Sequence, residues 1–331
     1  CVFPNRQRNK EKSNAMNHPA ILLCGHGSRD VQAISEFEAL AGHISRHLPE
    51  RQVAHGFLEF ARPTIGERLD DLRAAGARDV LALPGMLFAA GHVKNDIPSV
   101  LNDYAARHDG FSIRYGRELA VDLKLLSAAR ERITAAEAEA GEGISRADTM
   151  LVVVGRGTND PDANSNVSKI TRMLWEGMQF GWAETCYSGV TQPLVADALG
   201  RVVRLGFKRI IVFPYFLFTG VLVKRIYSAA DAVAQEHPDI EIVKAGYLND
   251  HPLVIDSFLE RLDEIPRGDN LMNCQLCKYR EQIIGYEQDQ GAAQVGHHHH
   301  VEGIGTDGDH GHDHAHGDHR HHHSHGPDKH E

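Results

Sequence analysis

The feature that most constrains the fold is an internal repeat. Matching residues of its two copies are separated by one fixed distance along the sequence, the distance from Pro63 to Pro193. Sliding the sequence over itself by that distance, without a gap, superposes three separated segments. The first segment pairs residues 23–28 with 153–158, and the second pairs Pro63 with Pro193. The third runs from Pro84 to Lys94 and pairs Pro84 with Pro214, residues 87–88 with 217–218, and residues 93–94 with 223–224. Solenoid repeats have much shorter periods, so the sequence predicts two copies of one domain rather than an array.

Each half alternates short apolar runs with amphipathic stretches. In the first half, strands are expected at residues 20–24, 52–60, 79–88 and 112–115, with helices at 31–48 and from about residues 65, 97 and 122. Strand–helix alternation is typical of parallel strands joined by right-handed crossovers. The predicted fold class is therefore α/β, with two duplicated domains that each contain a small parallel sheet flanked by helices.

Composition changes mark the expected domain boundaries. The Ala-, Glu- and Gly-rich stretch 135–145 is the expected junction, which places the domains at residues 17–140 and 147–266. Residues 1–16 are interpreted as a disordered or non-native N-terminal extension, because Met16 is a more natural start than Cys1. Residues 267–331 are predicted to form a tail that is disordered without metal, since it has almost nothing to bury.

Charge and composition argue against several classes of protein. The net charge of −10 disfavours a nucleic-acid partner, and much of it comes from residues 267–331, with 5 Lys and Arg against 11 Asp and Glu. No apolar run approaches the length of a membrane span, and the N-terminal stretch lacks the apolar segment of a secretory signal. Five irregularly spaced cysteines suit a reducing compartment, so a cytoplasmic protein is expected. Cys24 and Cys186 are expected to be inert core thiols.

Three ionisable residues are predicted to meet at one edge of the first sheet. His26 follows the first expected strand, Glu59 ends the second, and His92 lies just beyond the third. Ligands of open parallel sheets bind at the carboxyl ends of the strands. Two imidazoles and a carboxylate suit Co²⁺, Fe²⁺, Ni²⁺ or Zn²⁺, and they equally suit proton abstraction near neutral pH. So few protein ligands favour transient metal delivery over a structural metal site.

The second half carries different residues at the three matching positions, namely Arg156, Gly189 and Leu222. The surrounding scaffold residues persist while all three candidate ligands change together. If the three had only structural roles, at least one should have been kept in a copy of the same fold. The pattern instead predicts a site that the first half retained and the second half lost.

The segments around these residues resemble the sirohydrochlorin chelatases. They are Gly25-His26-Gly27-Ser28-Arg29, Phe57-Leu58-Glu59-Phe60 with Pro63-Thr64, and Leu87-Phe88 through Gly91-His92 to Asp96-Ile97-Pro98. The resemblance spans both halves and the tail, and it is to the long two-domain cobaltochelatases of cobalamin biosynthesis, in the ATP-independent class II. The sequence accordingly contains no Gly-x-x-x-x-Gly-Lys-[Ser/Thr] phosphate loop, and no nucleotide cofactor is expected.

The resemblance implies a catalytic chelatase domain at 17–140 and a chelatase-like domain with a degenerate site at 147–266. It implies that His26 and His92 bind the incoming Co²⁺ and accept pyrrole protons, with Glu59 assisting. Sirohydrochlorin is rich in carboxylates, so cations are expected around its cleft. The candidate substrate-binding residues are Arg29, Arg62, Lys94, Arg156, Lys224 and Arg225.

The tail contains two further metal-binding patterns. Cys274 and Cys277 form a Cys-x-x-Cys pair after Met272, and the resemblance links such a segment to an iron–sulfur cluster. Two thiolates make only half of a four-ligand site, so a homodimer or other ligands would have to complete it. The second pattern is interpreted as a cobalt or nickel reservoir that is dispensable for chemistry. Its histidines are His297, His298, His299, His300, His310, His312, His314 and His316.

Two other functions remain open at this point. The ligand set does not separate Co²⁺ insertion from Fe²⁺ insertion for sirohaem, although the two-domain length and the His-rich tail favour cobalt. A non-catalytic metallochaperone or metal-storage protein is the alternative outside the enzymes.

Overall fold

The computed structural model describes residues 18–141 and 143–269, together with isolated positions beyond them that include the short turn η5 (Glu287–Asp289). The first half contains β1 (Ala20–Gly25), α2 (Val31–His47), β2 (Val53–Phe57), α3 (Ile65–Ala74), β3 (Asp79–Pro84), the π-helical turn η1 (His92–Asp96), α4 (Ile97–Arg107), β4 (Ser112–Tyr115) and α5 (Leu123–Ala140). The second half contains η2 (Arg146–Asp148), β5 (Thr149–Gly155), α6 (Pro161–Met178), β6 (Trp182–Tyr187), α7 (Val195–Val202), η3 (Val203–Leu205), β7 (Arg209–Pro214), α8 (Val221–Glu236), β8 (Glu241–Lys244) and α9 (Pro252–Arg267).

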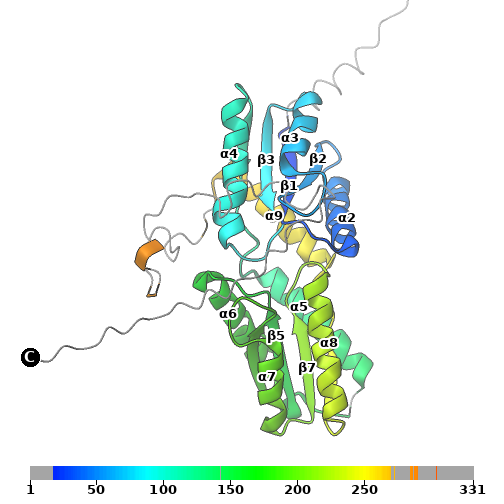
Figure 1. Cartoon of the computed structure of the whole chain (residues 1–331). Helices are drawn as coiled ribbons and strands as arrows, with labels where there is room; N and C mark the ends of the chain where they lie inside the picture. The colour runs from blue at the N-terminus through cyan, green and yellow to red at the C-terminus, as the bar shows by residue number, and fades with distance from the viewer. Residues whose placement is uncertain are drawn as a thin grey trace, which may run out of the picture.

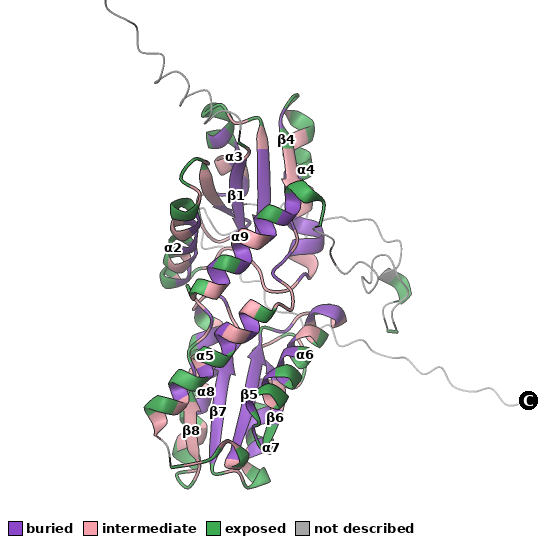
Figure 2. Cartoon of the chain, turned by 180° about the vertical axis from the view of Figure 1, so that it is seen from behind, coloured by how far each residue is buried: buried purple, intermediate pink, exposed green. Residues whose placement is uncertain are grey.

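The two halves have the same sheet topology, as the repeat predicts. The strand orders are β2-β1-β3-β4 and β6-β5-β7-β8, and every described strand pair is parallel. The central strands β1 and β5 are buried along their whole length, because helices cover both faces of each sheet. The predicted α/β fold with two small parallel sheets is confirmed (Figures 1 and 2).

The helices begin where side-chain caps replace missing backbone partners. Asp30 caps α2 by accepting from the backbone N–H of Gln32. Thr64 caps α3 in a capping box with Glu67. Such caps satisfy the free N–H groups of the first helical turn. They fix where each helix leaves the carboxyl edge of its sheet, and this edge carries the site.

The last helix of each half packs on the other half. Helix α5 packs against α6 and β8 of the second half, whereas α9 packs against α2 and β3 of the first half and also against α5 (Figures 1 and 2). Sequence analysis placed each of these helices within its own domain, at 17–140 and 147–266. The repeat does not predict this exchange, because the apolar face of an amphipathic helix does not indicate which of the two sheets it will cover.

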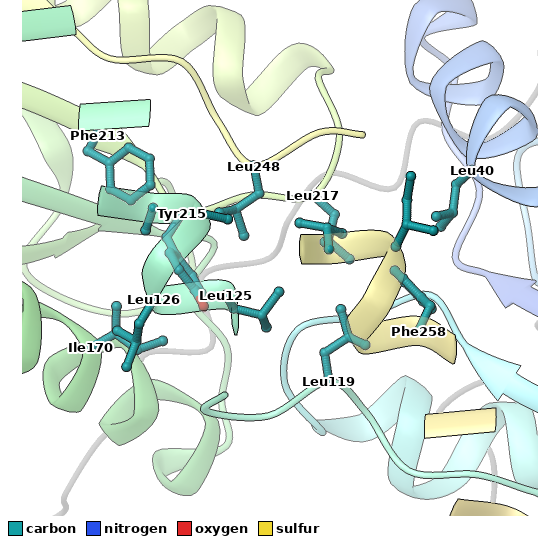
Figure 3. Close-up of a cluster of buried hydrophobic side chains, with 14 of the residues drawn as sticks. Leu40, Leu119, Leu125, Leu126, Ile170, Phe213, Tyr215, Leu217, Leu248 and Phe258 are labelled. Atoms are coloured by element: carbon teal, nitrogen blue, oxygen red, sulfur yellow. The ribbon is translucent and has the colours of Figure 1, made fainter. Parts of the chain in front are cut away.

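The exchanged helices create one core that both halves share. Leu125 and Leu126 of α5 lie close to Ile170 of α6, and Phe258 of α9 lies on the side of the first half (Figure 3). Phe258 is fully buried. Burial of this apolar surface stabilises the two halves against separation as well as against unfolding.

The difference in residue number between matching positions of the two copies changes once along the chain. This change coincides with the turn η1. Pro84 and Pro214 end equivalent strands at the repeat spacing, and Lys94 still matches Lys224. After Lys94 and Lys224, matching residues of the two halves are one residue closer together in the sequence. Strand β4 begins to pair at Ser112 and β8 at Glu241, whereas the repeat spacing would carry Ser112 onto Ile242. Ile97 and Ser99 already match Ile226 and Ser228 at the shorter spacing, so the extra residue of the first half lies at positions 95–96. A single inserted residue is a common origin of a π-helical turn.

Candidate metal centre

The structure brings His26, Glu59 and His92 together at the carboxyl edge of the first sheet. His26 Nε2 lies 2.9 Å from Glu59 Oε1, and the imidazole rings of His26 and His92 meet edge to face with centroids 4.4 Å apart. One ligand atom from each of the three residues lies within 4.8 Å of the others. A small inward movement of these side chains would place all three around one divalent ion.

Glu59 reaches this point from a loop, and the expectation that it ends a strand is wrong. Strand β2 ends at Phe57, and the chain then bends, with Phe60 in the left-handed region at φ 61°. The backbone N–H of Glu59 donates to the carbonyl of His26 at 3.0 Å, which ties the two candidate ligands together. The expected strand ending at Phe88 is also too long, since β3 ends at Pro84.

Gly27 makes this close approach of the two loops possible. Its φ is 96°, and a Cβ placed on it would lie 1.6 Å from the carbonyl oxygen of Glu59. Any L-residue with a side chain would push the His26 and Glu59 loops apart. The equivalent Gly157 has φ 83°, and a Cβ placed on it would lie 1.9 Å from the carbonyl oxygen of Gly189, so the same loop geometry persists in the second half.

His92 is the first residue of the π-helical turn, and Asp96 orients its ring. His92 Nδ1 lies 2.7 Å from Asp96 Oδ2, and the Asp96 side chain is only 2% exposed. With Nδ1 protonated, His92 donates to this carboxylate and presents Nε2 as the ligand atom. A carboxylate behind a histidine ligand fixes its tautomer and raises its basicity. Sequence reasoning assigned Asp96 no role, although its four-residue spacing from His92 was a usable signal.

His26 is oriented in a similar way by the backbone. Its Nδ1 lies 3.0 Å from the carbonyl oxygen of Gly27, so a proton on Nδ1 leaves Nε2 free to face Glu59. The aromatic ring of Phe60 lies 5.9 Å from the His26 ring, centroid to centroid. Both histidines can therefore offer a neutral Nε2 toward the same point.

The three residues lie beside a cleft between the two halves, with a volume of about 530 Å³. His26, Arg29, Phe60 and Phe88 line it from the first half, and the second half contributes Arg156 and an apolar wall. That wall is formed by Tyr215, Phe216, Leu217, Phe218, Val221 and Leu222. The volume falls in the range of roughly 300–1,000 Å³ that is typical of small-molecule sites, and the mainly apolar lining suits a flat organic ligand.

Arg156 occupies the place of His26 on the opposite wall. Its guanidinium donates to the carbonyl of Gly157 at 3.1 Å, just as His26 contacts the carbonyl of Gly27. Desolvation by the surrounding cleft lowers the pKa of Arg156, and the nearby Glu59 carboxylate opposes that shift. An arginine remains charged despite such a shift. With Gly189 and Leu222 at the other two positions, this wall offers a cation and no metal ligand.

The six candidate cations do not all reach the cleft. Arg29 lines it, with its guanidinium 4.9 Å from the centre of the Phe60 ring, and Arg156 lines it from the other half. Arg62 instead forms an ion pair with Glu67, and Arg225 is exposed outside the lining.

Lys94 and Lys224 also lie outside the lining, because each is held by an aspartate of the other half. Lys94 Nζ lies 2.6 Å from Asp160 Oδ2, and Lys224 Nζ lies 2.6 Å from Asp30 Oδ2. Whether a lysine faces solvent or an aspartate of the other half depends on how the two halves pack together. The sequence does not predict this packing.

The tail candidates lie outside the described residues. These are Cys274, Cys277 and the histidines His297, His298, His299, His300, His310, His312, His314 and His316. Cys24 and Cys186 are both buried free cysteines, as expected for core thiols. Burial raises the pKa of the Cys186 thiol to about 12, which keeps it protonated. In the part of the chain that the structure describes, no helix is long and apolar enough to cross a membrane.

The model of the CbiX family matches the chain twice, at residues 20–136 and 150–265. A sirohydrochlorin cobaltochelatase from Priestia megaterium is 38% identical over 80% of this chain and 86% of its own length. Sirohydrochlorin ferrochelatases from Priestia megaterium and Bacillus subtilis are 29% and 28% identical, over 70% and 74% of this chain and 85% and 91% of their own lengths.

Two solved structures of SirB from Bacillus subtilis are similar to the whole double domain. One is described as containing Fe³⁺, with 26% identity and a TM-score of 0.65 over 76% of this chain and 98% of that one. The other, from subspecies spizizenii and in complex with cobalt, has 27% identity and a TM-score of 0.63 over the same shares of the two chains.

Proposed function

This chain belongs to the CbiX family, and we propose that it inserts Co²⁺ into sirohydrochlorin to form cobalt-sirohydrochlorin for cobalamin biosynthesis. The observation that carries the proposal is the convergence of His26, Glu59 and His92 at the side of an apolar cleft. Metal ligands alone would suit many proteins, and so would an apolar cleft. Their combination suits a reaction in which an ion and a flat macrocycle must meet.

The ion is a substrate of the reaction, and the first half would hold it. His26 Nε2, His92 Nε2 and Glu59 Oε1 supply two borderline nitrogen ligands and one hard oxygen ligand, which suits Co²⁺ or Fe²⁺. Three protein ligands leave coordination positions open for the incoming pyrrole nitrogens. The opposite wall, with Gly189 and Leu222, adds no ligand that would retain the ion.

The same residues can take the protons that the reaction releases. The macrocycle loses two N–H protons as the metal–nitrogen bonds form, so one divalent ion enters and two protons leave. As the ion moves to the ring, His26 and His92 lose a ligand interaction and become free to accept those protons. Asp96, whose carboxylate lies 2.7 Å from His92 Nδ1, would hold the ring so that Nε2 is the nitrogen that receives a proton.

The macrocycle would lie between the two walls of the cleft. Phe60 and Phe88 on one side, and Leu217 and Leu222 on the other, provide apolar surfaces for its faces. Arg29 and Arg156 are the two candidate cations that line the cleft, and they suit the peripheral carboxylates. The second half would then serve mainly to bind the macrocycle, while the first half performs the chemistry.

Fe²⁺ insertion for sirohaem is the alternative that the ferrochelatase relatives favour. Cobalt is preferred here because the cobaltochelatase relative has the higher identity and covers more of the chain. The three ligand residues do not themselves distinguish the two ions.

The test is an anaerobic assay of purified protein with sirohydrochlorin and either Co²⁺ or Fe²⁺, followed by the absorption change of the macrocycle. Acceleration above the spontaneous rate is expected with Co²⁺, together with a lower kcat/KM for Fe²⁺. His26→Ala and His92→Ala should abolish the acceleration while the far-UV circular dichroism is unchanged. If neither ion is inserted faster than without protein, the enzyme proposal fails and metal carriage or storage becomes the better explanation.

Binding of the macrocycle by the second half has a separate test. Arg156→Ala should raise KM for sirohydrochlorin by about 10- to 100-fold while leaving Co²⁺ binding unchanged, because it removes a charged hydrogen bond worth roughly 1.5–3 kcal/mol. An unchanged KM would argue against this role of the second half.

For the tail we propose the reservoir role without any part in the chemical step. A chain ending at Val295 should keep its kcat at saturating Co²⁺ and lose rate only at low Co²⁺. Loss of turnover at saturating metal would contradict this. Cys274 and Cys277 are proposed as a soft-metal or iron–sulfur pair, and iron and sulfide analysis of anaerobically purified protein tests it.

A further inference from the structure

Two reciprocal ion pairs join the two halves. Lys94 of the first half contacts Asp160 of the second, and Lys224 of the second half contacts Asp30 of the first, each at 2.6 Å. Lys94 and Lys224 occupy equivalent positions in the two copies of the repeat, and so do Asp30 and Asp160. The duplicated chain therefore contains the same interdomain contact twice.

The two aspartates have the same second role. Asp30 Oδ1 accepts the N–H of Gln32 and caps α2, and Asp160 Oδ1 accepts the N–H of Asp162 and caps α6, both at 3.0 Å. In each case Oδ2 is the oxygen that meets the lysine. Each ion pair therefore attaches a lysine to the rigid start of a helix in the other half.

The two pairs differ in their burial. The Lys94 side chain is 5% exposed and the Asp160 side chain 1%, and Asp162 Oδ2 lies 3.7 Å from the same ammonium. The Lys224 side chain is 55% exposed. Exposed pairs contribute little, whereas removing one partner of a buried pair leaves an uncompensated charge inside the protein. Only the Lys94 pair is therefore expected to constrain its surroundings strongly.

The buried pair acts on the turn that carries a metal ligand. Lys94 is the middle residue of η1, two positions after His92 and two before Asp96. Tyr115 at the end of β4 holds the same turn by donating to the carbonyl of Val93 at 3.2 Å. Lys224 lies instead in the regular helix α8, two positions after Leu222, which is not a metal ligand.

We propose that Lys94 is a positioning residue through which the second half holds the His92–Asp96 turn in its metal-binding geometry. The contact with Asp160 and Asp162 keeps His92 Nε2 facing Glu59 and His26 while Asp96 fixes the other ring nitrogen. Ion binding by the first half thus depends on a contact with the second half. The inference rests on the proposed function only in taking a divalent ion as the ligand of the three residues.

The test measures Co²⁺ binding to the full chain without any macrocycle, from the visible absorption of the bound ion. The signal of this site is the component that is lost in His26→Ala, which separates it from ions bound elsewhere on the chain. Lys94→Met should weaken this component at least tenfold and alter its spectrum. Lys94→Arg, which keeps the charge, should restore binding to within about threefold of the unaltered protein. Lys224→Met, the matched change in the other half, should alter affinity less than twofold.

A second control separates positioning from general loss of structure. Arg209 is buried in an ion pair with Glu241, away from the cleft lining. Arg209→Met should lower the unfolding temperature but keep the Co²⁺ affinity. If it weakens Co²⁺ binding as much as Lys94→Met, the inference is wrong. If Lys94→Met does not fold, Lys94→Met with Asp160→Asn reduces the buried charge imbalance and should show the same weakened binding.

The outcomes distinguish this inference from the proposed function. If the unaltered protein binds Co²⁺ and Lys94→Met weakens that binding, the inference stands even when no insertion into sirohydrochlorin is seen. If the unaltered protein inserts Co²⁺ but Lys94→Met binds the ion with unchanged affinity, the positioning role is rejected and the proposed function is untouched.

Discussion

At the scale of single residues, Asp96 has a role that differs from those of the three candidate ligands. It lies behind His92, is almost fully buried, and would meet the metal only through the imidazole ring. The structure therefore separates residues that would touch the ion from one that orients a candidate ligand.

Replacing Asp96 with Asn should weaken Co²⁺ binding and lower kcat by about 10- to 100-fold, the range seen when a carboxylate behind a histidine ligand is lost. Asn keeps the size of the side chain but offers no carboxylate to orient the His92 ring. Isothermal titration and the insertion assay measure the two effects. Unchanged affinity and unchanged kcat would show that Asp96 is merely structural.

Glu118 provides a prediction about pH. Its side chain is buried, burial raises its pKa above the usual value, and its Oε2 has no hydrogen-bond partner among the described residues. The folded state then holds the Glu118 proton to higher pH than the unfolded state, so this residue lowers stability as pH rises through the folded pKa.

Glu118→Gln should therefore raise the unfolding temperature at pH 7, and the difference should vanish toward about pH 3, below the usual pKa of a glutamate, where the carboxyl is protonated in both states. Thermal unfolding followed by circular dichroism at several pH values tests this. A Glu118→Gln protein that is less stable at pH 7 would contradict the sign.

Much of the candidate site could be predicted at this scale, because the carboxyl ends of neighbouring parallel strands meet at one edge. That rule alone predicts that His26, Glu59 and His92 meet. The rule fails for Lys94 and Lys224, since their partners belong to the opposite half. Pairing between halves depends on a docking geometry that neither the repeat nor the charge pattern contains.

At the scale of elements, the turn η1 is the main difference between the two copies. The first half has Asn95-Asp96 where the second half has only Arg225, and the extra residue coincides with the π-helical hydrogen bonding. The turn thereby introduces Asp96 within reach of His92. It occurs in the half with the metal ligands and not in α8 of the other half.

Deleting Asn95 should convert η1 into regular helix and rotate His92 and Lys94 relative to α4 by about one residue, or roughly 100° at 3.6 residues per turn. We expect at least a tenfold loss of Co²⁺ affinity with secondary structure retained, because the second half folds without this residue. Metal titration and far-UV circular dichroism measure both. Retained affinity would mean that the extra residue is incidental.

Strand and helix order was predictable from hydrophobic periodicity, but two strand ends were not. The apolar runs through Phe60 and Phe88 continue past the actual ends of β2 and β3, because those residues line a cleft instead of extending a sheet. An apolar residue in the sequence predicts burial, but it does not indicate whether the side chain is buried against protein or against a ligand. Such overextended runs are therefore themselves a sign of a binding site.

At the scale of the whole molecule, the exchange of α5 and α9 makes each half incomplete alone. Two fragments, 1–142 and 143–331, produced together should associate and co-elute as one species, since each supplies a helix that covers the other's sheet. Produced singly, each should aggregate or bind a hydrophobic dye, because it exposes the apolar face left uncovered. Size-exclusion chromatography tests this, and two stable, separate monomers would contradict it.

The exchange of helices also decides beside which half the described chain leaves α9. The last turn of α9 lies beside the carboxyl end of β4, where Glu264 pairs with Arg117 and Ile265 packs against Gly116. The chain beyond Arg267 thus starts next to the half that holds His26, Glu59 and His92, although it follows the other half in sequence. If the proposed reservoir role holds, a His-rich segment tethered through this end of α9 would raise the local ion concentration at the proposed metal site more than one tethered to the second sheet would.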